Sequence, residues 1–386
     1  MNKQDKLYKI QNSIIAFGFI GFLFLSFLYT TLNSIDSYKK AKSADRVIEA
    51  WNMDYDIDTN LKVNVFGKNN YLNLQGEISK IINKREFNGV IKLNNGYLSS
   101  AQEKADEDIL DMNAKSLAYI QEYLNEKGVD FIYVRAPYKI SIYDSELTQG
   151  VTDYSADNSK RFAELLEKYN INYIDIGYEM YQDGIDQYDY FYKTDHHWTP
   201  EAGIYAFSKI NEEISKKYKM CKNNKYTNTD SYITEVYEDW YLGSNGQRVG
   251  VFYAGADDMH FIRPKDEVII TDKTIDKTAP FSEIMFDTSV LEKRDYNQRL
   301  VYDNLYGYAM GHRLLNNCAD NDLRVLICSD SMGKVVVPYM VLSYREVQWS
   351  LLTKKDIDSF KPNVVIILEY QYNETTYCND EFQVDF

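Results

Sequence analysis

An uninterrupted apolar stretch lies near the start of the 386-residue chain. Residues 13–32 have the sequence SIIAFGFIGFLFLSFLYTTL and contain no charged side chain. About twenty such residues are enough for a helix to span the hydrocarbon core of a bilayer. A cleaved signal peptide is the alternative, but its apolar core is usually shorter, and no convincing small-residue cleavage site follows here. We therefore expect an uncleaved transmembrane signal anchor at 13–32.

The flanks of the predicted anchor are both basic, so charge alone does not orient it. Lysines lie at positions 3, 6 and 9 before the span, and the stretch NSIDSYKKAKSADR follows it. The positive-inside rule does not determine the orientation when both sides carry such charges. We expect a short tail at 1–12, a polar stalk at 33–84 and a folded domain at 85–386.

Beyond residue 85 the apolar pattern switches repeatedly between short buried runs and helical periodicity. The segment 87–100 alternates around Asn94-Asn95-Gly96 and predicts a β-hairpin. Later strands are predicted at 130–137, 172–176, 324–330, 346–352 and 363–370, and helices at 101–128, 157–169, 200–217, 331–344 and 353–360. Alternating strands and helices predict an α/β fold in three layers, with a mostly parallel sheet covered by helices on both faces.

A different pattern occupies about 218–300. The stretches DWYLGSNGQRVGVFYAG and DEVIITD are punctuated by glycine and rich in β-branched residues. We interpret this part as a β-rich insertion in the α/β domain. The sequence does not indicate its role.

Charge and cysteine content narrow the classes of function. The formal net charge of −15 disfavours nucleic acid as a partner, because phosphate binding needs a basic surface. The four cysteines form no CxxC pair, which disfavours a structural zinc site and leaves a disulfide open. The 35 tyrosines fit either AT-rich codon usage or, for some of them, an aromatic carbohydrate-binding surface.

Three polar groups follow predicted strands, where ligands of open α/β sheets bind. They are Asp195-His196-His197, Ser329-Asp330-Ser331 and Glu369. A serine at a strand-to-helix turn exposes its hydroxyl, and its N–H can help to form an oxyanion hole. Such a serine needs an adjacent base, which histidine can supply, and a carboxylate to orient that base. Asp195 and His197 are two positions apart, so an extended loop directs both side chains the same way.

Other interpretations of these groups remain open. A serine after a strand is often only a helix N-cap, and two histidines before a tryptophan can be a structural turn. The Asp-His-His cluster could also bind a metal ion, as in manganese-dependent phosphoesterases. His260, Asp257 or Asp258 would then be the further ligands.

Several blocks of the sequence resemble the DHHW protein family. These proteins are SGNH hydrolase-like and related to the alginate O-acetyltransferases AlgX and AlgJ. The most specific block is YKTDHHWTPEAGIYAF; weaker ones are NGVIKLNNGYL, VDFIYVRAPYKISIY, GSNGQRVGVFYAGADDM, RVLICSDSMGKVVVPYM and KPNVVIILEY. Together they span about 85–370. The family's Gly-Asp-Ser block has Ser329 in place of its glycine.

The resemblance implies a circularly permuted SGNH-like domain with a catalytic triad in the order Asp, His, Ser. Asp195 then matches the acid, His197 the base and Ser331 the nucleophile. His196 is expected to be structural or to line the substrate cleft, and Trp198 to pack beneath the loop.

Further residues are weaker candidates for binding substrate or the oxyanion. Trp198 itself and Lys139 of the Pro-x-Lys turn are candidates for substrate contact. Gly311, Asn316 and Asn317 are candidates for the second oxyanion donor.

The resemblance implies a membrane-anchored O-acetyltransferase or acetylesterase that acts on an exopolysaccharide or cell-wall glycan. It implies a cytoplasmic N-terminus, an extracellular domain and a partner, a multi-pass membrane O-acyltransferase (MBOAT) that supplies acetyl groups. We expect no cofactor and no metal ion. The alternatives are a non-enzymatic glycan-binding scaffold and a metal-dependent phosphoesterase.

Overall fold

A computed structural model of the chain describes residues 3–43, 65–219, 224–296, 301–307 and 309–375. It divides into two units, Met1–Gln75 and Gly76–Phe386. The first unit is dominated by the helix α1, Lys3–Ser43. Within it, Ile10–Asp36 is long and apolar enough to cross a membrane, as an anchor or as a signal sequence.

The described parts of the predicted stalk contain two helices. The helix α1 continues to Ser43, and α4 spans Lys68–Ile81. Residues 44–64 of the stalk lie outside the described residues. The boundaries of tail, anchor and stalk therefore stay predictions.

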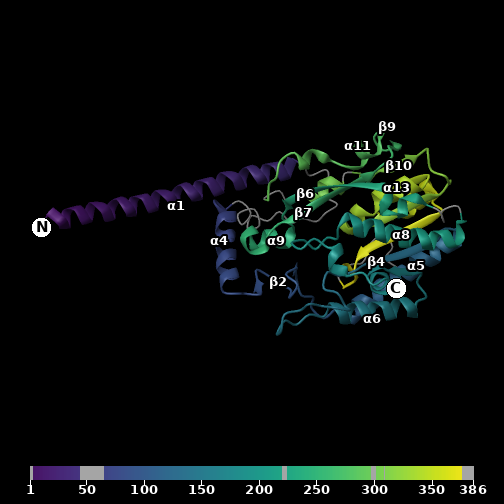
Figure 1. The fold of residues 1–386 in the computed structure, drawn as a ribbon, viewed down its shortest axis with the longest axis horizontal. Helices are drawn as coiled ribbons and strands as arrows, with labels where there is room; N and C mark the ends of the chain where they lie inside the picture. The colour runs from purple at the N-terminus through teal and green to yellow at the C-terminus, as the bar shows by residue number, and fades with distance from the viewer. Residues whose placement is uncertain (1–2, 44–64, 220–223, 297–300, 308, 376–386) are drawn as a thin grey trace. The chain divides into compact units, whose positions relative to one another are not determined.

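The second unit is built on a mixed sheet of strands flanked by helices (Figure 1). Its strand order is β5-β4-β13-β11-β12-β10-β8-β9. The strands β5 to β12 in this order are parallel, and β10, β8 and β9 run antiparallel to their neighbours. Their bounds are β4 Asp130–Ala136, β5 Tyr173–Asp175, β8 Ile269–Asp272, β9 Lys277–Pro280, β10 Arg313–Asn316, β11 Arg324–Ser329, β12 Glu346–Trp349 and β13 Val364–Tyr370.

Helices cover both faces of this sheet, which confirms the predicted three-layer α/β architecture. Phe131 and Tyr133 of β4 point into one apolar core, and Ile132 and Val134 point into the other. The first core is closed by α5 Glu107–Glu126, α6 Ser155–Lys168 and α14 Lys354–Phe360. The second is closed by α8 Pro200–Lys217 and α13 Val337–Ser343.

The predicted hairpin at 87–100 forms a small three-stranded sheet. Its strands are β1 Glu86–Phe87, β2 Val90–Lys92 and β3 Leu98–Ser99. The helix α5 begins later than predicted, because the Asp106 carboxylate caps it by accepting the Asp108 N–H at 2.8 Å. Short helices that the pattern did not indicate follow other strands: α7 Ile176–Gln182, α11 Phe281–Met285 and α12 Val301–Gly307.

The region 218–300 is less uniformly β-structure than its composition indicates. The strands β6 Tyr232–Tyr241 and β7 Asp257–Pro264 form a separate antiparallel pair, and β8 and β9 extend the main sheet. The stretch between β6 and β7 instead forms the helices α9 Ser244–Val249 and α10 Val251–Ala254, so its interpretation as β-structure is wrong. Gly250, at φ +83°, separates the two helices, and tertiary contacts outweigh the β-branched composition.

Candidate active site

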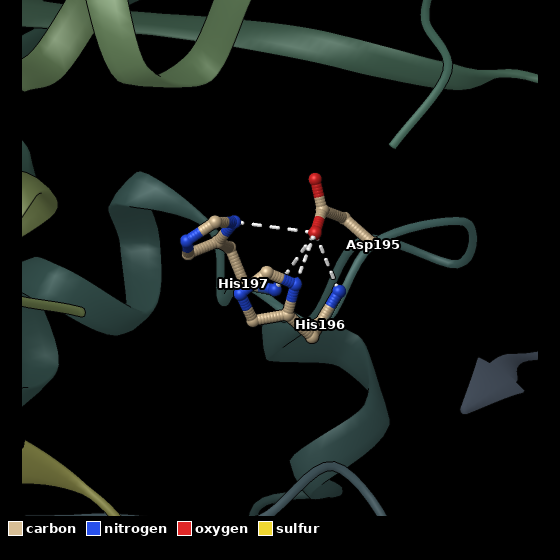
Figure 2. A group of neighbouring side chains, drawn as sticks. All are labelled: Asp195, His196 and His197. Carbon is tan, nitrogen blue, oxygen red and sulfur yellow. Dashed lines mark hydrogen bonds and ion pairs between the residues drawn. The ribbon is translucent and has the colours of Figure 1, made fainter. Parts of the chain in front are cut away.

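The Asp-His-His segment forms a tight loop immediately before α8 (Figure 2). The Asp195 side chain is buried and its Oδ1 atom accepts the N–H of His196 at 2.6 Å. The same oxygen lies 3.2 Å from Nδ1 of His197. Pro200 at the first turn of α8 fixes the exit of the loop. The loop thus directs Asp195 and His197 toward each other, as their spacing predicts.

Ser331 meets this pair from the other predicted strand end. It is the first residue of the 3₁₀ helix η7, Ser331–Val335, which follows β11. Its Oγ lies 2.8 Å from Nε2 of His197, although the two residues are 134 positions apart in the chain. Asp195, His197 and Ser331 are therefore connected in the order carboxylate, imidazole, hydroxyl. This is the geometry of a charge-oriented base next to a nucleophile.

The electrostatic setting keeps the carboxylate charged and the imidazole neutral. Burial alone would raise the pKa of Asp195, but the two histidines and their hydrogen bonds hold that pKa well below its usual range. Burial lowers the pKa of His197, and the neighbouring His196 lowers it further, against the opposing effect of Asp195. A neutral His197 can accept a proton from Ser331 at neutral pH.

Two residues of the 218–300 region complete the shell of Asp195. The hydroxyl of Tyr241, at the end of β6, donates to Oδ2 of Asp195, and Ser244 Oγ donates to Oδ1 at 2.9 Å. Between them, Gly243 lies so close to Asp195 that a Cβ there would overlap the aspartate side chain. The sequence pattern gave no role to this region. Gly243 was the one feature of the sequence that could have indicated this close approach to Asp195.

Lys139 is buried below the loop and does not line a cleft. Its ammonium group donates to the carbonyl oxygens of Tyr192, Lys193 and Asp195 at 2.6, 2.8 and 2.5 Å. Burial lowers its pKa to about 7, against the opposing charges of Asp257 and Asp195. The expected substrate contact of Lys139 is therefore corrected: with 0% of its surface exposed, it holds the loop from beneath.

Asp257 supports the same loop from β7. Its carboxylate accepts the backbone N–H groups of Lys193 and Thr194 at 2.7 and 2.8 Å, and the Thr194 hydroxyl at 2.5 Å. Lys139 and Asp257 thus satisfy loop carbonyls and loop N–H groups respectively. The loop is held on both sides by buried charged side chains.

Trp198 packs beneath the loop, as predicted. Its other expected role, contact with the substrate, is corrected. Its side chain is fully buried and its Nε1–H donates to the carbonyl of Met332 at 2.9 Å. It ties the histidine loop to the turn that carries Ser331, and it cannot touch a substrate. On the opposite side, the Tyr302 ring stacks on His197 with centroids 4.2 Å apart.

His196 is the more exposed of the two histidines. Its Nδ1 atom lies 2.8 Å from Ser244 Oγ and 2.9 Å from Oδ1 of Asp195. Its ring packs on that of His197 at a centroid distance of 3.9 Å. The position is compatible with both expectations for His196, because its Nδ1 edge and one ring face are in contact with protein while 39% of the side chain is exposed.

The expected oxyanion donors Asn316 and Asn317 lie at the wrong edge of the sheet. Asn316 ends β10, which runs antiparallel to β12, and its N–H donates to the carbonyl of Arg345 before β12 begins. That edge is opposite the end of β11 that leads to Ser331. Asn317 follows there and is exposed. Gly311 lies nearer, but its N–H is already bonded to the carbonyl of Trp349 at 2.9 Å.

The turn around Ser331 offers one donor of its own. Among the described residues, the Ser331 N–H has no hydrogen-bond partner. The preceding Asp330 accepts the N–H of Met332 at 2.8 Å and so caps η7. Ser329, in the family's glycine position, is accommodated because its Oγ accepts the Trp349 Nε1–H at 2.9 Å and faces Gly333.

The further metal ligands considered from the sequence are engaged elsewhere. Asp195, His196 and His197 offer ligand atoms within 4.8 Å of one another. His260 pairs with Glu201 at 2.6 Å, and Asp258 accepts the Asp239 N–H at 2.8 Å. Within the described part of the chain, the Asp-His-His cluster is therefore not extended by the predicted residues.

Glu369 and the cysteines are not joined to the triad. Burial, and then the charge of Asp330, raise the pKa of Glu369 to about 8, and the Tyr133 hydroxyl donates to it at 3.2 Å. Cys318 and Cys328 are free thiols. Cys221 and Cys378 lie outside the described residues.

Comparison with known proteins identifies part of the chain. Residues 97–239 match the SGNH hydrolase-like domain of acetyltransferase AlgX. This stretch of the chain is therefore similar to an SGNH hydrolase-like domain. The matched stretch contains Asp195 and His197 but ends before Ser331. A search of curated proteins returned no match.

Solved structures share the fold of this chain at low sequence identity. Bacillus cereus PatB1 is 16% identical, with a TM-score of 0.60 over 76% of this chain and 98% of PatB1. The structure of PatB1 with a sulfonyl adduct is 15% identical, with a TM-score of 0.61 over 77% and 97%. A DHHW family protein from Eubacterium siraeum is 16% identical, with a TM-score of 0.55 over 76% and 94%. The resemblance expected from the DHHW block is confirmed.

Proposed function

We propose that this protein is a membrane-anchored serine O-acetyltransferase that acts on an exopolysaccharide or cell-wall glycan. The contact that carries the proposal is the 2.8 Å approach of His197 Nε2 to Ser331 Oγ, with Asp195 on the other side of the imidazole. The match to the AlgX acetyltransferase domain supports an acyltransferase-type enzyme. Acetylesterase activity would be the same chemistry with water as the acceptor.

In the first half-reaction Ser331 attacks the carbonyl carbon of an acetyl donor. The Oγ–C bond forms while His197 takes the hydroxyl proton on Nε2. Asp195 stabilises the resulting imidazolium. The free N–H of Ser331 is a donor for the developing oxyanion. The tetrahedral species then collapses to acetyl-serine, and the leaving group takes the proton from His197.

In the second half-reaction a sugar hydroxyl replaces the leaving group. His197 removes its proton, the new C–O bond forms, and the Ser331 Oγ departs and regains the proton. This two-step transfer needs a donor outside the bilayer. We propose a multi-pass membrane O-acyltransferase as its source, a cytoplasmic N-terminus and an extracellular domain.

The test uses the full-length chain in detergent with p-nitrophenyl acetate as the acetyl donor. We expect turnover by the wild type that a chelator does not change, and an acetyl group on Ser331 in mass spectra. Ser331→Ala and His197→Ala should lower turnover by several orders of magnitude, whereas removing one oxyanion donor costs roughly 10²–10³-fold. Ser359→Ala, an exposed serine on α14, is the matched control.

Each alternative has its own outcome in this assay. Loss of turnover on chelation would favour metal-dependent catalysis at the compact Asp195-His196-His197 cluster, as the phosphoesterase alternative requires, over the serine triad. Equal background rates in all variants, with no adduct, would reject the enzyme and favour a glycan-binding scaffold. In that case Ser331→Ala would keep its function in cells.

A further inference from the structure

Four exposed tyrosines follow the carboxyl ends of strands beside the triad. Tyr372 follows β13, Tyr143 follows β4, and Tyr178 and Tyr181 lie on α7 directly after β5. Between 40% and 54% of each tyrosine's surface is exposed. The strands β13, β4 and β5 are successive neighbours in the sheet, beginning next to β11, which leads to Ser331. We call these four residues the tyrosine track.

The near end of the track is fixed to the serine turn. The Asp330 carboxylate accepts both the Tyr370 N–H and the Asn373 Nδ2–H at 2.7 Å, and these bracket Tyr372. The Tyr370 ring lies 6.0 Å from His196 and is stacked with Tyr372 at 6.4 Å. Tyr372 therefore lies one ring beyond the half-exposed histidine of the candidate active site.

The far end of the track borders a groove of about 850 Å³. Gln371 connects the two ends, because its Nε2 donates to Asp175 at 3.4 Å and its Oε1 accepts the Tyr138 N–H at 3.0 Å. Asp175 ends β5 and lines the groove. With strands about 4.8 Å apart, the three spacings from β11 to β5 amount to roughly 14 Å. That span is longer than the small acetyl donor requires.

The chemistry of the track suits a sugar chain. Exposed tyrosine rings can pack against the C–H faces of sugar rings. Tyr143 and Tyr181 form a stacked pair with centroids 4.1 Å apart, so each covers one face of the other and only the remaining faces can meet a sugar. Carboxylates along the groove can accept sugar hydroxyls, which fits the mixture of aromatic and polar groups in ligand sites. The lining includes Tyr143, Tyr178, Asp175 and Glu179.

The charged residues of the groove favour uncharged glycans over anionic ones. Six acidic and four basic residues line the groove, and the whole chain has a net charge of −15. Three of the four cations are already in ion pairs: Lys209 with Glu179 and Asp183 at 3.1 and 2.8 Å, Lys216 with Glu213, and Arg135, which is fully buried, with Asp175 and Glu374. Within the described structure Lys160 is exposed and has no ion pair, so the acidic residues of the groove still outnumber its uncommitted cations. A polyanionic glycan would meet repulsion here, while an uncharged one would not.

We propose that the tyrosine track and its groove bind the acceptor, an uncharged glycan chain of several sugar units that extends from Ser331 past Tyr372. This inference rests on the proposed function and adds the substrate class and the residues that hold it. The catalytic groups act on one hydroxyl, and the track holds the adjoining sugars of the same chain.

The experiment measures binding by calorimetry with the full-length chain in a detergent that has no sugar headgroup. The probes are cellotetraose, the β-linked tetramer of N-acetylglucosamine, and tetragalacturonate. We expect at least one uncharged tetramer to bind at least tenfold more tightly than tetragalacturonate. Tyr372→Ala and Tyr181→Ala should each weaken that binding about tenfold. Phe252→Ala removes an equally exposed ring outside the track and should leave it unchanged.

Hydrolysis of p-nitrophenyl acetate separates this inference from the proposed function. Both tyrosine variants should keep the wild-type rate, because the small ester does not reach the track. Tighter binding of tetragalacturonate, binding that survives both tyrosine substitutions, or no binding of either uncharged tetramer would each overturn the acceptor site. A wild type without Ser331-dependent turnover would overturn the proposed function alone, since calorimetry needs no reaction.

Discussion

At the residue scale, Asp195 is the centre of the candidate site. Its two oxygens receive donors from His196, His197, Ser244 and Tyr241, so a buried negative charge is fully compensated. Compensation of this kind is needed because an unpaired buried charge is costly. The charge in turn fixes which nitrogen of His197 faces Ser331.

The lowered pKa of His197 predicts the pH dependence of the proposed reaction. The base must be neutral, so kcat/KM falls as the pH drops through the His197 pKa. Because that pKa is below the ordinary 6.5, the midpoint of the acid limb should lie below pH 6.5. The measurement is the pH profile of p-nitrophenyl acetate turnover. A midpoint at or above 6.5 would contradict this environment for the imidazole.

The substitution Tyr241→Phe tests the hydrogen bond that Oδ2 of Asp195 accepts from the Tyr241 hydroxyl. The substitution removes its donor, so we expect the free energy of unfolding at pH 7 to fall by about 1–3 kcal/mol. Because the Asp195 pKa is depressed in the folded state, its contribution is present above the unfolded pKa and is lost as the pH falls through the folded pKa. The difference between variant and wild type should therefore shrink in acid.

Urea denaturation at pH 7 measures this difference. Tyr237→Phe is the control, because it changes the same strand at a hydroxyl without a hydrogen bond in the described structure. Equal losses of stability in the two variants would reject the role of the Tyr241 hydroxyl.

At the element scale, the 218–300 region supports the triad through the β6–α9 junction. Gly243 allows this junction to touch Asp195. We expect Gly243→Ala to displace the loop and to lower turnover at least tenfold while the domain still folds. Gly128→Ala is the matched control, since Gly128 has φ +71° and open space around it, so it should lose stability without losing activity.

Turnover and thermal midpoints of both glycine variants distinguish the two effects. Full activity in folded Gly243→Ala would show that the close approach is dispensable. A parallel loss of activity in both variants would trace the effect to stability alone.

The sequence predicted the elements that meet at the triad better than the elements that support it. Strand ends and the two-residue spacing of Asp195 and His197 are local properties, and parallel strands bring their carboxyl ends to one edge. Asn316 was misplaced because a single sequence does not tell whether a strand runs parallel or antiparallel. The roles of Tyr241 and Lys139 depend on packing between distant segments, which no local pattern encodes.

At the scale of the whole molecule, the apolar part of α1 predicts membrane attachment. We expect the full-length chain to sediment with membranes and to resist extraction by alkaline carbonate. Its intact N-terminus should be found by mass spectrometry. External protease should digest the domain in intact cells while sparing the tail before residue 13.

A released chain that begins shortly after residue 32 would instead identify the helix as a cleaved signal sequence. Protection of the domain from external protease would overturn the proposed orientation. Both outcomes leave the geometry of Asp195, His197 and Ser331 unchanged, because these residues belong to the other unit.

The position of β13 has a consequence for biosynthesis. It is the last strand that the structure describes, yet it lies between β4 and β11 at the interior of the sheet. During synthesis from the N-terminus, the edge of β4 that pairs with β13 therefore stays unpaired until β13 has been made. The candidate triad therefore cannot assemble on a nascent chain that lacks β13. Under the proposed function and orientation, Ser331 would become reactive only after β13 has been made and has crossed the membrane.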